Sequence, residues 1–133
     1  MVASPFLDSN ILIYAYGDDQ KTPLAQAICS RPHVLSVQSL NEFANVTHRK
    51  MQYDWDRIKP CLVSILDLAE RVLPLTVELH GRGTVLAERY KLQIYDGMIL
   101  AAALEAECDT LYSEDMHHGL VIEDRLTIRN PFV

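Results

Sequence analysis

The sequence has few of the features that mark a secreted, zinc-binding or membrane-spanning protein. Its three cysteines, Cys29, Cys61 and Cys108, are widely spaced and form no CxxC pair, so we expect reduced thiols and no zinc site. The longest apolar run, residues 98–104, is far shorter than the ~18 residues that a membrane span needs. The first residues carry no basic segment and reach a carboxylate at Asp8, unlike a signal peptide. These absences predict a cytoplasmic protein without a membrane segment.

Basic residues are also scarce, with 12 Lys and Arg against 18 Asp and Glu and a formal net charge of −6. A basic surface is the usual sign of a nucleic-acid-binding protein, so the composition by itself argues against such a partner. That argument is reversed if several acids lie together around a metal ion. The remaining composition, 49% hydrophobic and 23% charged over 133 residues, predicts one globular domain spanning residues 1–133.

Short apolar segments alternate along the chain with longer segments of helical periodicity. The segments expected to form strands are residues 3–7, 34–37, 71–75, 110–113 and 126–128. The segments expected to form helices are residues 11–15, 21–30, 40–47, 54–70, 77–91 and 96–107. Ser39 and Asp54 are expected to cap the third and fourth of these helices. Short strands that alternate with helices indicate a parallel sheet covered on both faces, so the predicted fold class is α/β.

Four acidic residues fall at places that such a fold brings to one edge of the sheet. Asp8 directly follows the first strand, and Asp115 follows a later strand by two residues. Glu42 lies one turn into the helix after the second strand, and Asp96 opens the most apolar helix. Ligands of open parallel sheets bind beyond the carboxyl ends of the strands, so we expect the four carboxylates to lie together.

Carboxylates that lie together repel each other and raise each other's pKa values unless a cation holds them. Because the set contains only oxygen donors, it suits Mg²⁺ or Mn²⁺. Each residue also has a plainer interpretation. Asp8 and Asp96 could be helix N-caps, worth about 1 kcal/mol each. Glu42 could be a solvated helix residue and Asp115 a turn residue, but the occurrence of all four favours a metal site.

Four segments resemble the motifs of the PIN-domain family, and in length the chain is similar to its VapC-type toxin ribonucleases. The segments are residues 6–14 (FLDSNILIY), 39–43 (SLNEF), 95–103 (YDGMILAAA) and 111–116 (LYSEDM). The resemblance extends from residue 6 to about residue 132. It departs from the family at Gly97, where Ala is more usual, and we expect this change to free the backbone without touching the chemistry.

The resemblance implies a PIN-like three-layer α/β/α sandwich with a mostly parallel central sheet. It also implies a Mg²⁺-dependent endoribonuclease that is the toxin of a bacterial type II toxin–antitoxin pair and cuts structured RNA such as tRNA. The expected partners are therefore an RNA substrate, a cognate antitoxin protein and a second copy of the chain in a homodimer.

The family's acidic residues map onto Asp8, Glu42, Asp96 and Asp115, of which Asp8, Asp96 and Asp115 are the implied metal ligands. Family positions that support the metal shell map onto Asn10 and Ser113. The fourth motif offers two adjacent acids, and its hydroxyl-x-Asp pattern favours Asp115 over Glu114 as the ligand.

Three further residues are candidates for contact with RNA. Arg49 follows Glu42 by seven residues, on nearly the same helix face and about 10 Å along it, where it could bind a phosphate or simply complement the helix dipole. His117 and His118 directly follow Asp115 and either meet the substrate or belong to a solvated loop.

Other functions also fit parts of the pattern. One is a catalytically inactive PIN-like binding module, against which the full acidic set argues. Another is a metal-dependent DNA nuclease or 5′-nuclease. A receiver-like signalling domain is also α/β, but it requires an acidic pair after the first strand and a lysine after the fifth, and this pattern is absent.

Overall fold

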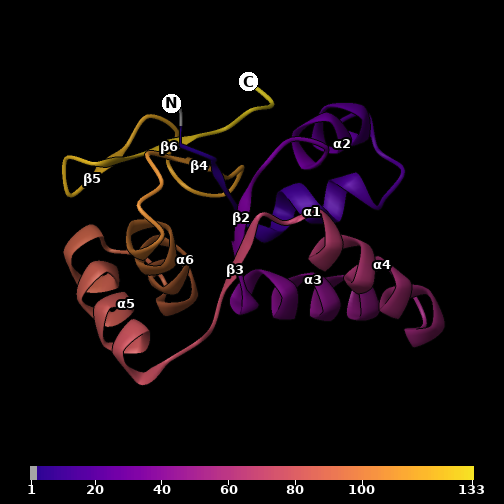
Figure 1. The fold of residues 1–133 in the computed structure, drawn as a ribbon, viewed down its shortest axis with the longest axis horizontal. Helices are drawn as coiled ribbons and strands as arrows, with labels where there is room; N and C mark the ends of the chain where they lie inside the picture. The colour runs from indigo at the N-terminus through magenta and orange to yellow at the C-terminus, as the bar shows by residue number, and fades with distance from the viewer. Residues whose placement is uncertain (1–2) are drawn as a thin grey trace.

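The computed structural model describes residues 3–133, in which a six-stranded sheet separates two groups of helices (Figure 1). The strands are β1 (Phe6–Leu7), β2 (Val34–Ser36), β3 (Arg71–Leu73), β4 (Thr110–Tyr112), β5 (Val121–Ile122) and β6 (Leu126–Arg129). The helices are α1 (Ser9–Ala15), α2 (Thr22–Cys29), α3 (Val37–Arg49), α4 (Trp55–Leu68), α5 (Val77–Tyr90) and α6 (Ile94–Glu105). The predicted α/β fold class and three-layer sandwich are thus confirmed.

The sheet has the strand order β3-β2-β1-β4-β6-β5. All of its neighbouring strands are parallel except β5, which runs antiparallel to β6. From β1 the chain first builds the sheet outward through β2 and β3, and then returns to the other side of β1 with β4. The order therefore reverses between β1 and β4, and the carboxyl ends of these two strands form the crevice in which open α/β sheets bind ligands.

The strands are short, and each sends successive side chains to opposite faces of the sheet. Phe6 and Leu111 pack into the core on one face, whereas Leu7 and Leu35 pack into the core on the other. The first core lies beneath α5 and α6, and the second is covered by α1, α2, α3 and α4 (Figure 1). Burial of both faces explains why the strands read as continuous apolar segments rather than as alternating ones.

Helix α6 is the most deeply buried helix, as its apolar sequence predicts, with seven consecutive buried residues from Gly97 to Ala103. It packs against α5 through two glycines. A Cβ added at Gly97 would overlap the carbonyl oxygen of Gly83, and one added at Gly83 would lie 2.9 Å from Sδ of Met98. The expectation that Gly97 merely frees the backbone is therefore wrong, because this glycine lets two helix backbones touch.

No helix within residues 3–133 is long and apolar enough to cross a membrane.

Several predicted boundaries are also wrong. Val37 was expected to end a strand, but it begins α3. The residue at the N-cap position is Ser36 rather than Ser39, whose hydroxyl lies buried and donates to the carbonyl oxygen of Leu7 at 3.3 Å. Asp96 does not open α6, because that helix begins two residues earlier at Ile94. The predicted cap at Asp54 is confirmed, since its carboxylate accepts from the backbone N–H of Arg57.

Candidate active site

Asp8 lies at the carboxyl end of β1 and is the N-cap of α1. One of its oxygens, Oδ1, accepts from the backbone N–H of Ser9 at 2.7 Å, and Oδ2 accepts from Oγ of Ser113 at 2.8 Å. The side chain is 4% exposed. Burial raises the pKa of Asp8 to about 6, against the lowering effect of these two hydrogen bonds, and the negative charges of Asp96 and Asp115 raise it further.

Asn10 connects Asp8 to the loop that follows β4. Its Nδ2 atom donates to Oδ2 of Asp8 at 3.5 Å and to Oδ2 of Asp115 at 3.2 Å. Its Oδ1 atom accepts from the backbone N–H of Glu114 at 3.2 Å. Ser113 holds the same loop, because its Oγ atom accepts from the backbone N–H of Met116 at 3.3 Å. Asn10 therefore contacts Asp8 and Asp115, and Ser113 contacts Asp8. These contacts are the ones expected of residues that support the metal shell.

The two acids after β4 have different surroundings. Glu114 forms an ion pair with Lys21 and accepts a hydrogen bond from the Tyr14 hydroxyl at 2.6 Å. Partial burial acts to raise the pKa of Glu114, but the hydrogen bonds from Lys21 and Tyr14 outweigh it and lower that pKa. Asp115, by contrast, is exposed, and its carboxylate accepts a hydrogen bond from the side chain of Asn10. The protein's own groups thus engage Glu114 and leave Asp115 as the more available carboxylate.

Glu42 and Asp96 come from helices on opposite faces of the sheet, α3 and α6. Burial raises the pKa of Glu42 to about 7; the charges of Asp8 and Asp96 add to this, while the side chains of Ser9 and Gln38 oppose it. The pKa of Asp96 is also raised, first by burial and then by Asp115. These mutual effects mean that the four predicted acids share one electrostatic environment, as their places in the sequence indicate.

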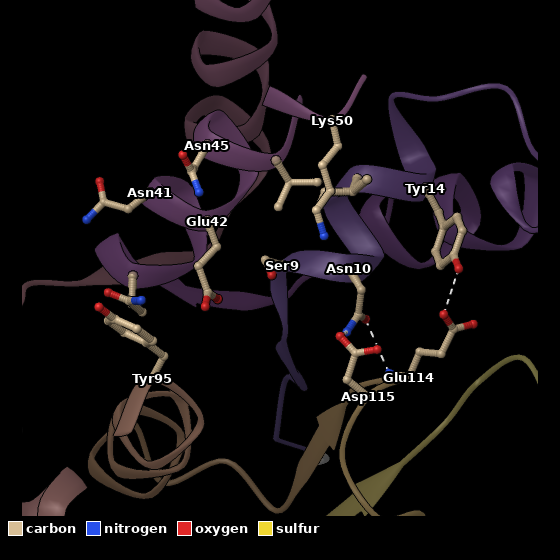
Figure 2. A pocket seen from close by; sticks show the side chains of 13 residues that line it. Ser9, Asn10, Tyr14, Asn41, Glu42, Asn45, Lys50, Tyr95, Glu114 and Asp115 are labelled. Carbon is tan, nitrogen blue, oxygen red and sulfur yellow. Dashed lines mark hydrogen bonds between the residues drawn. The ribbon is translucent and has the colours of Figure 1, made fainter. Parts of the chain in front are cut away.

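A crevice of ≈ 690 Å³ opens above this edge of the sheet, and Figure 2 shows it from close by. Glu42, Glu114 and Asp115 line it together with Ser9 and with Asn10, one of the two expected support residues. Asp8 is buried beneath them. The other lining residues are Ile13, Tyr14, Gln38, Asn41, Asn45, Val46, Lys50 and Tyr95.

The candidates for RNA contact do not all lie at this crevice. Arg49 lies on a smaller hollow of ≈ 340 Å³, which shares Asn45, Val46 and Lys50 with the crevice. His117 and His118 are exposed and are not among the residues that line either space. Nδ1 of His118 accepts from the backbone N–H of Asn130 at 2.9 Å.

The donor chemistry of the site fits a hard divalent cation. Its available side-chain donors are carboxylate oxygens, and their raised pKa values reflect burial and negative charge that a cation would offset. Within residues 3–133, however, no three His, Cys, Asp or Glu side chains converge closely enough to surround an ion. The acids therefore match a cation in kind, and binding one would require them to draw closer together.

Sequence reasoning missed several residues of the site. Lys21 and Tyr14, which engage Glu114, come from a loop and from α1, and neither lies near Glu114 in the sequence. Tyr95 and Lys50 line the crevice, but neither was assigned a role, although Tyr95 opens the motif that contains Asp96. The neighbour of each offered a signal, because Tyr95 directly precedes Asp96 and Lys50 follows Arg49.

The reversal of strand order, the buried Asp8 beside it and the crevice above define an α/β domain with a carboxylate site at the switch point of its sheet. The chain belongs to the PIN domain family, whose model matches residues 6–119. No curated protein sequence matches the chain significantly.

Solved structures similar to this fold include proteins of toxin–antitoxin systems. The crystal structure of Mycobacterium tuberculosis VapC20, a sarcin–ricin loop cleaving toxin, has a TM-score of 0.71 at 18% identity, covering 84% of this chain and 90% of that one. A toxin–antitoxin complex from Klebsiella pneumoniae has a TM-score of 0.66 at 20% identity, covering 84% and 87%. VapBC2 from Rickettsia felis, bound to a DNA fragment from its promoter, has a TM-score of 0.61 at 18% identity, covering 96% and 98%.

Proposed function

We propose that this protein is a Mg²⁺-dependent endoribonuclease and the toxin of a toxin–antitoxin pair. The observation that carries the proposal is the electrostatic coupling of Asp8, Glu42, Asp96 and Asp115 at the switch point of a PIN-domain sheet. The similarity of the fold to VapC20, which is described as cleaving the sarcin–ricin loop, supports RNA as the substrate.

Asp8, Asp96 and Asp115 are the residues that would hold the cation, with Mn²⁺ as a substitute for Mg²⁺. A bound divalent cation supplies positive charge that polarises the phosphate and promotes ionisation of a water molecule. Ser113 and Asn10 fix the orientation of Asp8, and Asn10 also holds Asp115. These hydrogen bonds keep the oxygens that would face the cation in place before the substrate arrives.

Glu42 is suited to orient the attacking water or to exchange a proton with it. Its carboxylate lies on the wall of the crevice, and its pKa of about 7 lets it exist in both protonation states near neutral pH. Attack by water makes the ribose 2′-hydroxyl unnecessary as a nucleophile. The expected products therefore carry a 5′-phosphate and a 3′-hydroxyl.

Regulation of such an enzyme would come from a cognate antitoxin. The negative charge of the crevice suits a basic segment of that partner, and two of the similar structures contain toxin–antitoxin pairs. We further propose a homodimer in the cytoplasm, with each protomer binding one antitoxin chain. Co-expression with the neighbouring reading frame should then relieve toxicity and yield a stable complex.

The proposal is tested by incubating the purified protein with RNA and with DNA, in Mg²⁺ and in EDTA. We expect cleavage of RNA in Mg²⁺ or Mn²⁺ only, and little turnover in Ca²⁺ because its looser coordination activates water poorly. Asp8→Asn and Asp96→Asn should each abolish cleavage while the protein remains folded. The matched control is Asp67→Asn, which removes an exposed carboxylate of α4 and should cut as the wild type does.

Three results would contradict the proposal. Full cleavage by both aspartate variants would remove the assigned site. Cleavage of DNA alone would indicate a metal-dependent DNA nuclease. Activity that persists in EDTA and leaves a 2′,3′-cyclic phosphate would instead assign the chemistry to a general base such as His117 or His118.

A further inference from the structure

We propose that the crevice binds a single-stranded stretch of RNA along α3, with one base stacked on Tyr95 and neighbouring phosphates held by Arg49 and Lys50. This inference rests on the proposed nuclease function. It specifies that the RNA is single-stranded where it binds and that it runs along α3. It is carried by the placement of an exposed aromatic ring, Tyr95, on one wall of the crevice, opposite a polar helix face near whose end Lys50 lies (Figure 2). Arg49 directly precedes Lys50 and lies on the adjoining hollow.

Tyr95 is the aromatic side chain of the crevice whose ring remains available. It is 57% exposed at the start of α6, and within residues 3–133 its ring stacks on no other aromatic ring. Tyr14, on the opposite side, packs edge-on against Phe132 and donates its hydroxyl proton to Glu114. Trp55 is also exposed, but it stacks on His48 and does not line the crevice. An unpartnered ring beside a nuclease site is suited to stack an unpaired base.

The opposite wall is the polar face of α3. Gln38, Asn41 and Asn45 line the crevice from this helix, and Arg49 follows them at the same helical spacing. Residues spaced by three or four along a helix share one face, so these side chains form a continuous row. Amide groups carry both donors and acceptors and can hydrogen-bond the edges of exposed bases or the 2′-hydroxyl.

Charge changes sign along this row. Glu42 lies on the wall of the crevice beside this row, whereas Arg49 lies seven residues further along α3, about 10 Å away along the axis. Arg49 and Lys50 are exposed, and neither pairs with an acid within residues 3–133. A strand whose reacting phosphate meets the acids and their cation would thus present its next phosphates to these two free cations.

The same arrangement favours a single strand over a duplex. A paired base is already stacked on both faces and hydrogen-bonded on its Watson–Crick edge, so it cannot reach a protein ring in a crevice. An unpaired base has both faces and its edge free, which is why sequence-dependent RNA recognition concentrates on loops, bulges and ends. The crevice would therefore act on an exposed loop of a structured RNA.

Binding is measured separately from cleavage, by the fluorescence anisotropy of a labelled single-stranded RNA of about 10 nucleotides in Ca²⁺, which should occupy the site but support little turnover. We expect Tyr95→Ala to weaken binding about 5- to 150-fold, the loss of one stacked base, and Tyr95→Phe to bind as the wild type does. Trp55→Ala is the control and should change nothing. Wild-type affinity in Tyr95→Ala, equal affinity for the annealed duplex, or no binding of the wild type to RNA would each overturn the proposed path.

The phosphate contacts are measured by the dependence of this affinity on salt. Each phosphate contact on a single strand contributes a slope of about 0.7 in log K against log salt, so Arg49→Ala/Lys50→Ala should reduce the slope by about 1.4. The control Arg31→Ala/Lys59→Ala removes two exposed cations elsewhere and should leave the slope unchanged. An unchanged slope in the first double variant would contradict the assignment.

These tests separate the two proposals. If the protein cuts RNA but none of the crevice variants changes binding, the nuclease function stands and the path along α3 is wrong. If the protein never cuts RNA but Tyr95→Ala and Arg49→Ala/Lys50→Ala weaken binding as described, the catalytic function fails and the crevice is an RNA-binding site.

Discussion

At the carboxyl ends of β1 and β4, the buried Asp8 lies near Asp96 and Asp115, whereas between α5 and α6 two helix backbones meet through Gly83 and Gly97. The first region concentrates like charges that burial penalises. The second is closely packed and its contacts are apolar. The contrast indicates that the α5–α6 contact stabilises the fold, while the crevice reduces stability at the site that we propose binds a cation.

The largest change in stability is expected from filling the glycine contact. Gly97→Ala places a Cβ against the backbone of Gly83, which cannot rotate away as a side chain could. We expect a loss of about 3 kcal/mol in the free energy of unfolding, at the upper end of ordinary overpacking. Urea unfolding of the variant measures it.

The matched control for this change lies on α5 itself. An added Cβ at Gly81 would meet nothing within 4 Å. Gly81→Ala should therefore stabilise the protein by about 0.5–1 kcal/mol, because alanine restricts the unfolded chain and favours the helix. Equal effects at Gly97 and Gly81 would show that close packing does not distinguish the two positions.

The layered fold and the proximity of the four acids could be predicted from the sequence because both follow simple regularities. Buried parallel strands require short apolar segments such as 34–36, and the carboxyl end of each strand is the place from which a side chain reaches the crevice. Asp8 directly follows its strand, and Asp115 follows the predicted strand 110–113 by two residues. Once these two strands are neighbours in the sheet, the two acids lie near each other.

Features that depend on long-range contacts or unusual backbone could not be predicted. Strand β5 was missed because the turn that joins it to β6 places Glu123 and Asp124 at φ of 53° and 57°, where glycine or asparagine is the usual signal. The start of α3 was displaced because the β-branched Val37 reads as strand. The ion pair of Lys21 with Glu114 joins residues far apart in the sequence, so no local pattern contains it.

A smaller effect is expected from pH in the crevice. Burial is the main cause that raises the pKa of Asp8 from 3.8 to about 6 and that of Glu42 from 4.5 to about 7. For each residue, at pH values between its ordinary pKa and its raised pKa, the folded protein binds more protons than the unfolded chain. The free energy of unfolding therefore falls as the pH rises through this range. In EDTA we expect Asp8 to contribute about 2 kcal/mol of this fall, and the more exposed Glu42 to contribute less.

Asp8→Asn provides the comparison for the pH effect. The variant cannot ionise at this position, so its stability should vary less with pH in EDTA and should equal or exceed that of the wild type near neutral pH. Urea unfolding from about pH 4 to about pH 7.5, which spans these pKa values, measures both proteins. A steeper pH dependence in the variant would show that the buried Asp8 does not destabilise the folded protein.

The most direct test of the central claim, that the acids of the crevice form a cation site, is the midpoint of thermal unfolding with and without Mg²⁺ near neutral pH. At a Mg²⁺ concentration ten times its dissociation constant, binding to the folded state alone stabilises it by about 1.4 kcal/mol, a shift of roughly 3–6 °C for a chain of this size. We predict this shift for the wild type and for the control Asp67→Asn, and its loss in Asp8→Asn. An equal shift in all three proteins, or none in the wild type, would contradict the account.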